Sequence, residues 1–386
     1  MQLKASAANE LGLYDQAIFG FPLKPSDPPD LSLPTSADWQ AEPAVDVIAR
    51  LAAHRRIVMV NEAHHYAHTR VLTLALLPRL RALGFNYFAA EALTGDAKGM
   101  MKRGYALQSD GTEYLHEPLY GDIIREAIRL GFTIVAYDAD GNPAARETRQ
   151  ADNLYRQVFA RDPNARLFVH AGYAHIDKAA GRLGRTPPMA MQLAKLTGIE
   201  PLSVDQTQFL ETRLDKTDNY HQLIARFHPT GRVVLVRRTG DQVWSAQPKL
   251  YDANVILPPS LNMKAFGDEG MYGTRLDPKT LYIDDSIRFS PTTPTLNEMS
   301  RPAWLSRGGK RLPYAISATL CRNNVPCVVE AHFINEPDDA VAADRYVFLK
   351  AHSSSRLYLS PGRYRLRAWN ENGKTLSERI VQISNR

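Results

Sequence analysis

IVMVNEAHHYAHTR, residues 57–70, is the stretch from which the fold of this chain can be inferred. Four apolar residues run almost directly into an acid and three histidines, Glu62, His64, His65 and His68. An uninterrupted apolar run that stops at polar residues is typical of a buried strand that ends in a loop. The polar residues form either a catalytic or ligand-binding centre or a loop that ends the strand and begins a helix, so the neighbouring segments must decide.

Short apolar runs alternate with helical patterns from residue 57 to about residue 245. Leucines at helical spacing follow the first run, and Gly84 ends that helix. Strands that are apolar throughout, each followed by a helix, predict an α/β fold with a parallel sheet covered by helices on both faces. The predicted strands are 57–60, 86–93, 132–138, 166–172 and 201–205.

At 386 residues the chain is longer than one hydrophobic core usually supports, so two domains are expected. Residues 231–246 predict a hairpin that closes the first domain, because Thr-Gly-Asp separates two β-rich runs. Short strands with turn signals near the C-terminus predict an antiparallel β-sandwich. The predicted parts are an extended N-terminal arm (1–45), the α/β domain (46–258), an irregular connection (259–310) and the β-sandwich (311–386).

Composition limits the classes of partner. The net charge of +6 comes from scattered residues and not from a basic run, so nucleic-acid binding is not expected. No stretch approaches the ~20 consecutive apolar residues of a membrane span, so no integral membrane segment is expected. Cys321 and Cys327 flank a turn and are either a small disulfide loop or two reduced thiols. A disulfide would favour a periplasmic or secreted protein over a cytoplasmic one. The oligomeric state is not predicted.

Acids and histidines follow the ends of all five predicted strands. Ligands of an open parallel sheet bind outside the carboxyl ends of its strands, so these residues are expected at one edge. Helix capping is the simpler explanation for the aspartates, and His68 is expected to lie solvated in the first turn of a helix. The residues are Glu62, His64, His65, Glu91, Asp138, Asp140, His170, His175 and Asp205.

Two chemistries fit such a set. A neutral histidine accepts a proton from water when an acid on its other nitrogen fixes the tautomer. Imidazole and carboxylate groups also bind divalent metals such as Zn, Mn or Co. The chain has neither the GxSxG motif of serine hydrolases nor the glycine-rich motifs that bind phosphates.

Residues 58–93, 146–154 and 169–176 resemble, in the right order, the motifs of the erythromycin esterase, ChaN and TraB/Tiki superfamily. In that family a strand ends in Gly-Glu-x-His or Gly-Glu-x-x-His, a helix follows, and the next strand ends in a glutamate. The resemblance covers roughly residues 50–245 and not the final sandwich. The resemblance implies one of three functions: that of the esterases, which act without metal, that of the Tiki members, which resemble metal-dependent peptidases, or that of the ChaN members, which bind haem.

Carried over to this chain, the resemblance assigns Glu62 and Glu91 to the two motif glutamates and His175 to the late histidine. His64 fits the ChaN and Tiki spacing, whereas His65 fits the esterase spacing. Asn61 departs from the family, which has glycine there, and its side chain is expected to narrow the approach to the pocket.

The resulting prediction is a hydrolase of an ester, lactone or amide, with a small-molecule or peptide substrate. His64 or His65 activates water, Glu62 orients that histidine, and Glu91 and His175 complete the acid/base set. The predicted substrate-binding residues are His170, Arg146, Asp138 and Tyr173. One alternative is an extracytoplasmic protein that binds haem or another ligand without turnover, with Tyr66, Tyr173 or a histidine as haem ligand. Another is an inactive site beside a sandwich that mediates protein contacts.

Overall fold

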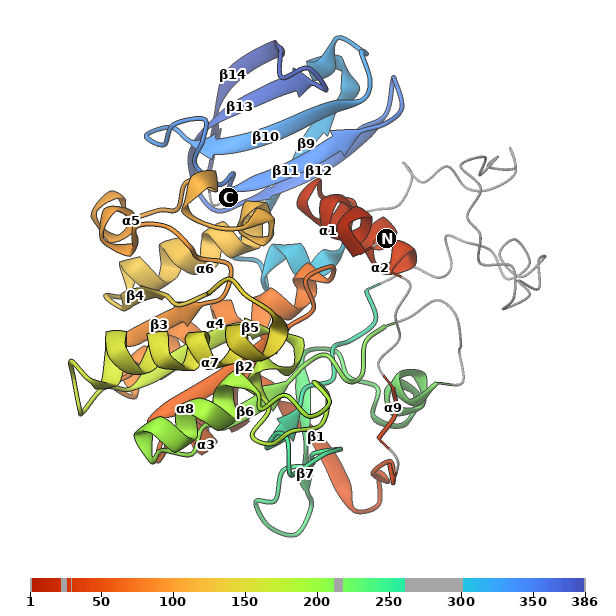
Figure 1. Ribbon diagram of the computed structural model, residues 1–386. Coiled ribbons are helices and arrows are strands. Elements are labelled where there is room, and N and C mark those ends of the chain that lie inside the picture. The colour runs from red at the N-terminus through yellow and green to blue at the C-terminus, as the bar shows by residue number, and fades with distance from the viewer. Residues whose placement is uncertain (1, 22–25, 29, 212–217, 261–300, 385–386) are drawn as a thin grey trace.

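The computed structural model describes residues 2–21, 26–28, 30–211, 218–260 and 301–384. Its centre is a six-stranded parallel sheet with helices on both faces (Figure 1). The strand order is β4-β3-β5-β2-β6-β8, and the bounds are Thr133–Ala136, Tyr87–Ala90, Leu167–Gly172, Ile57–Glu62, Leu202–Asp205 and Ala253–Asn254. The predicted α/β class is confirmed, and β8 is a sixth strand that sequence analysis missed.

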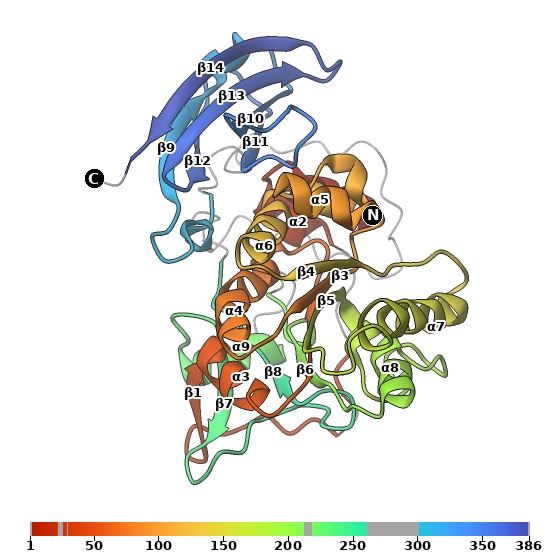
Figure 2. The same cartoon turned by 90° about the vertical axis from the view of Figure 1, so that its left-hand side faces the viewer.

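Successive residues of β2 enter different cores because side chains alternate across a strand. Val58 and Val60 pack with the helices of one face, and Ile57 and Met59 with those of the other. The first face carries α3 (Ala44–Ala52), α4 (Arg70–Ala82) and α6 (Pro118–Arg129), and the second carries α7 (Pro143–Leu154) and α8 (Met189–Thr197). Figure 2 shows these two layers on opposite sides of the sheet.

The remaining α-helices and strands that accompany the parallel sheet lie around it. They are α5 (Ala97–Arg103), α9 (Asn219–Phe227), β1 (Trp39–Pro43) and β7 (Val233–Arg237). β7 pairs antiparallel with β1, and the predicted hairpin turn is present, since Trp244 N–H donates to Leu235 O at 2.8 Å.

The N-terminal segment differs from the prediction. Residues 1–45 were expected to be extended, but α1 (Gln2–Glu10) and α2 (Tyr14–Gly20) are helices. The prediction is therefore wrong for these residues. The Pro-rich sequence that suggested it begins only after α2, and α2 buries Tyr14, Ala17 and Ile18 against the rest of the molecule.

The C-terminal part of the chain is the predicted antiparallel β-sandwich. One sheet has the order β11-β10-β13-β14, and the other pairs β12 with β9. The bounds, in that order, are Asp344–Phe348, Cys327–Phe333, Gly362–Asn370, Thr375–Ile383, Ser354–Leu359 and Leu312–Ser317. Cys321 and Cys327 form a disulfide whose Cα atoms are 6.0 Å apart.

Most of the predicted irregular connection, residues 261–300, lies outside the described residues. Within the described part of the chain, none of the helices combines the length and the apolar character needed to cross a membrane.

Candidate functional site

The site forms where β3, β5 and β2 lie side by side. Glu62 at the end of β2 is level with Gly172 at the end of β5, and Glu91 directly follows β3. The N–H of Glu91 donates to His170 O at 3.0 Å, which fixes its place beside β5. Two glutamates that are 29 positions apart in the sequence thus face the same edge of the sheet.

Glu62 is buried among cationic and neutral donors. Its Oε2 lies 2.5 Å from Arg70 Nε and 3.2 Å from His170 Nε2, and its Oε1 lies 2.9 Å from His64 Nδ1. Burial alone would raise the pKa of Glu62, but Arg70 and the two histidines outweigh it and hold the pKa well below its usual range. Glu62 is therefore a carboxylate at neutral pH.

The structure distinguishes the two adjacent histidines. The side chain of His64 is 17% exposed and stacks on Tyr114, with ring centroids 4.0 Å apart. His65 is 4% exposed and stacks on Phe21 at 3.5 Å, with Nδ1 3.2 Å from Tyr173 Oη. Burial and the neighbouring His64 lower the pKa of His65 to about 3, so it is neutral. His64 is the histidine paired with Glu62.

Gly172 permits the close approach of the two halves of the site. A Cβ atom at this position would lie 2.5 Å from Cε1 and 2.6 Å from Nε2 of His64, and 3.1 Å from Glu91 Oε2. Because real Cβ atoms do not approach other atoms so closely, any larger residue would displace His64. The His64 imidazole and the Glu91 carboxylate therefore both lie against the backbone of Gly172, at the end of β5.

Glu91 binds a second pair of cations. Its Oε1 lies 2.6 Å from Arg146 Nη2 and 3.1 Å from His175 Nε2, and its Oε2 accepts from Gly172 N–H. Glu147 Oε1 lies 2.6 Å from His175 Nδ1. Burial would lower the pKa of His175, but Glu91 and Glu147 outweigh it and raise the pKa to about 10. His175 is therefore an imidazolium at neutral pH and not the base of this site.

The other predicted substrate-binding residues have different positions. The rings of Tyr173 and His64 are nearly perpendicular, with centroids 5.1 Å apart. Asp138 Oδ1 accepts from Arg146 Nε at 3.0 Å and so orients that guanidinium. His170 is fully buried beneath Glu62, with Nδ1 2.9 Å from Thr73 Oγ1. The expected contact of His170 with substrate is wrong because no surface of its ring is accessible.

The expectation for His68 is also wrong. Its ring is 1% exposed and stacks on Trp304 at 4.9 Å, in the short 3₁₀ turn Ala67–Thr69 before α4. Burial lowers its pKa well below the ordinary value, so it is a neutral part of the core.

Asn61 points away from the site. Its Nδ2 donates to Asp205 Oδ1 at 2.7 Å, to Thr207 Oγ1 at 3.1 Å and to Tyr173 O at 2.8 Å. Its Oδ1 accepts from Gln206 N–H at 2.6 Å. The expected narrowing of the pocket is therefore wrong. Asn61 links β2 to the loop after β6 and holds Tyr173, whose φ of 40° is unusual for a residue with a side chain.

Sequence reasoning missed several members of the site. Glu147 directly follows Arg146 in the sequence, so its place beside a predicted site residue was a usable signal. The contacts of the others with Glu62, His64 or Arg70 could not be read from sequence spacing. The missed residues are Arg70, Glu117, Tyr114, Glu147 and Gly172.

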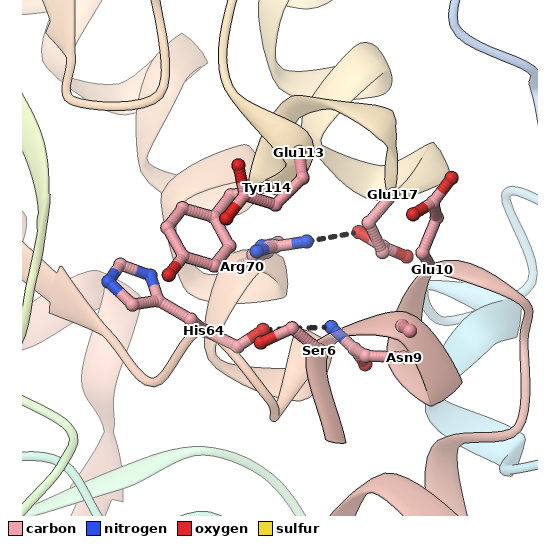
Figure 3. Close-up of a pocket in the computed structure, with 9 residues that line it drawn as sticks. Ser6, Asn9, Glu10, His64, Arg70, Glu113, Tyr114 and Glu117 are labelled. Carbon is pink, nitrogen blue, oxygen red and sulfur yellow. Dashed lines mark hydrogen bonds and ion pairs between the residues drawn. The ribbon is translucent and has the colours of Figure 1, made fainter. Parts of the chain in front are cut away.

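A small pocket opens beside His64. Figure 3 shows the Tyr114 ring next to the imidazole, with Arg70 directed toward Glu117. The pocket lining also includes residues of α1, namely Ser6, Ala7, Asn9 and Glu10. Among the described residues, no group of three or more His, Cys, Asp or Glu side chains has an arrangement that could hold a metal ion.

Comparison with known proteins gives limited matches. No protein-family model and no curated protein matches the sequence. A solved structure described as bacterial protein toxins has 16% identity and a TM-score of 0.31, covering 44% of this chain and 38% of its own. The type III effector HopBA1 has 13% identity and a TM-score of 0.31, covering 48% of this chain and 94% of its own. RRSP, a MARTX toxin effector domain from Vibrio vulnificus CMCP6, has 16% identity and a TM-score of 0.31, covering 39% and 34%.

Proposed function

We propose that this protein is a hydrolase of an ester, lactone or amide in which His64 activates the attacking water. The observation that carries the proposal is the contact of 2.9 Å between His64 Nδ1 and the buried carboxylate of Glu62. A carboxylate at this position accepts a hydrogen bond from Nδ1–H, which keeps the proton on Nδ1 and leaves the Nε2 lone pair free to take a proton from water. Glu62 also stabilises the imidazolium that results.

The second half of the site supplies positive charge. Attack of the hydroxide on the carbonyl carbon places a negative charge on the carbonyl oxygen. Arg146, with 29% of its side chain exposed, is the cation beside Glu91 that stabilises this oxygen. The imidazolium of His175 adds positive charge nearby but no hydrogen bond, because Glu91 and Glu147 contact both of its nitrogens. The proton held by His64 then passes to the departing oxygen or nitrogen as its bond to the carbonyl carbon breaks.

Glu62 and Glu91 have their charges balanced within the chain. Arg70 contacts both oxygens of Glu62, and Arg146 and Gly172 N–H contact the two oxygens of Glu91. These contacts support a hydrolase that acts without metal, since the oxygens of both carboxylates already accept hydrogen bonds from protein groups. The haem-binding alternative has less support, because Tyr66 is 2% exposed and its hydroxyl donates to Glu211 at 3.2 Å.

A screen of p-nitrophenyl esters, lactones and fluorogenic amides with the purified protein tests the proposal. Turnover by the wild type and its loss in His64→Gln supports it. Turnover that persists in His64→Gln, with the variant folded, overturns it. We further propose a periplasmic or secreted location, supported by the Cys321–Cys327 disulfide.

A further inference from the structure

The N-terminal helices lie outside the region of family resemblance, yet they contact the site directly. α1 forms one wall of the pocket beside His64 (Figure 3), and Phe21, immediately after α2, stacks on His65. These contacts raise the question of whether α1 and α2 only cover the site or help to arrange it.

A chain of buried hydrogen bonds joins α2 to the base. Tyr14 Oη donates to Glu117 Oε1 at 2.9 Å, and Arg70 Nη1 donates to Glu117 Oε2 at 2.9 Å. The other side of the Arg70 guanidinium holds Glu62, which contacts His64. Tyr14, Glu117, Arg70 and Glu62 are each at most 2% exposed, so water does not substitute for a missing partner in this chain.

Arg70 shares one positive charge between two buried carboxylates. The Tyr14 hydroxyl donates a hydrogen bond to the Glu117 oxygen that Arg70 does not contact. This bond stabilises the Glu117 carboxylate, which therefore attracts the Arg70 guanidinium less strongly. Without that hydroxyl, Glu117 has one donor fewer and competes more strongly for the guanidinium that holds Glu62. The orientation of Glu62, and with it that of His64, therefore depends on a side chain of α2.

Asn9 of α1 acts on the same histidine through its backbone. Its Nδ2 donates to His64 O at 3.2 Å, and its Oδ1 accepts from Ala67 N–H at 3.3 Å. This pair of bonds spans the turn that carries His64. α1 is itself held by the sandwich, because Arg345 of β11 donates to Glu10 Oε1 at 2.8 Å.

We infer that α1 and α2 are a working part of the site, in which Tyr14 and Asn9 are positioning residues for His64. The inference rests on the proposed function, in which His64 is the base. It assigns to the N-terminal segment a role in catalysis and to the β-sandwich a role in holding that segment in place.

Tyr14→Phe is the decisive variant, because it removes one hydroxyl and keeps the ring that packs against Trp304. Loss of one buried hydrogen bond predicts a fall of about tenfold in kcat with little change in KM. The ¹⁵N chemical shifts of the His64 imidazole should also move, because the fraction with a proton on Nδ1 falls. Tyr155→Phe, on the other face of the sheet, is the matched control and should change neither measurement.

A double-mutant cycle tests the route. If Tyr14 acts through Glu117, the effect of Tyr14→Phe largely disappears in a Glu117→Gln background. Asn9→Ala provides an independent variant and should shift the same ¹⁵N signals with Tyr14 intact.

Wild-type kcat and unchanged His64 signals in a folded Tyr14→Phe protein would overturn the inference. If the signals move but the wild type hydrolyses no substrate, the proposed function fails and the positioning of His64 by Tyr14 stands. If Tyr14→Phe does not fold, unchanged signals in Asn9→Ala overturn the inference.

Discussion

His64 Nδ1 lies 2.9 Å from Oε1 of Glu62, only two residues earlier in the chain. The neighbouring His65 instead faces Phe21 and Tyr173. This arrangement favours the Glu-x-His spacing over the Glu-x-x-His spacing, and the predictions for His64, His65 and Gly172 depend on it.

His64→Gln should lower kcat/KM about 100-fold or more, because general-base catalysis typically contributes 10²–10⁴-fold. His65→Gln should cost less than about tenfold, since that ring is neutral and packs beside the site without contacting Glu62. Rates with a responsive ester, together with melting curves of both variants, check the contrast. Equal losses in two folded variants would contradict the choice of His64.

Gly172→Ala should also impair activity. The added Cβ would lie 2.5 Å from His64 Cε1, so the imidazole must move, and a displacement of about 1 Å can cost on the order of 100-fold in rate. Gly231→Ala is the matched control, because a Cβ there meets no atom within 4 Å. A fully active Gly172→Ala protein would show that His64 does not act from this position.

His175 predicts a specific dependence of stability on pH. Its pKa of about 10 in the folded protein exceeds the ordinary value of 6.5, so the imidazolium stabilises the fold fully below about pH 6.5. That contribution is lost as the pH rises through about 10. The free energy of unfolding of the wild type should exceed that of His175→Gln by a few kcal/mol at pH 6 and by much less at pH 10.5.

Urea denaturation at several pH values measures this difference. His54→Gln changes an exposed histidine and should change the free energy of unfolding only slightly. A constant difference between wild type and His175→Gln would contradict the raised pKa.

Asn61→Ala should destabilise the protein by about 2–4 kcal/mol, since it leaves buried partners on β6 and in the following loop unsatisfied. Release of Tyr173 should also reduce activity. Asn372→Ala, in the exposed turn between β13 and β14, should change stability by less than about 0.5 kcal/mol. Chemical denaturation of both variants tests the comparison, and equal stability of Asn61→Ala and wild type would refute the role of Asn61.

The sequence by itself determined the class of the fold and the edge of the sheet at which the candidate site lies. Continuous apolar strands followed by helices require a covered parallel sheet, and the carboxyl ends of such strands lie at one edge. Glu62 and Glu91 could be placed together for that reason. α1 and α2 could not be anticipated, because the buried surface that stabilises short helices is provided by distant parts of the chain.

Only the tertiary structure decided which side chains interact at that edge. Adjacent histidines have equal local signals, and the choice of His64 follows from a glycine on β5 and a tyrosine far along the chain. The burial of His170 and the pairing of Arg70 with two glutamates likewise depend on how layers pack. Strand periodicity places a residue at an edge, whereas the charge and direction of its side chain depend on neighbours that sequence spacing does not specify.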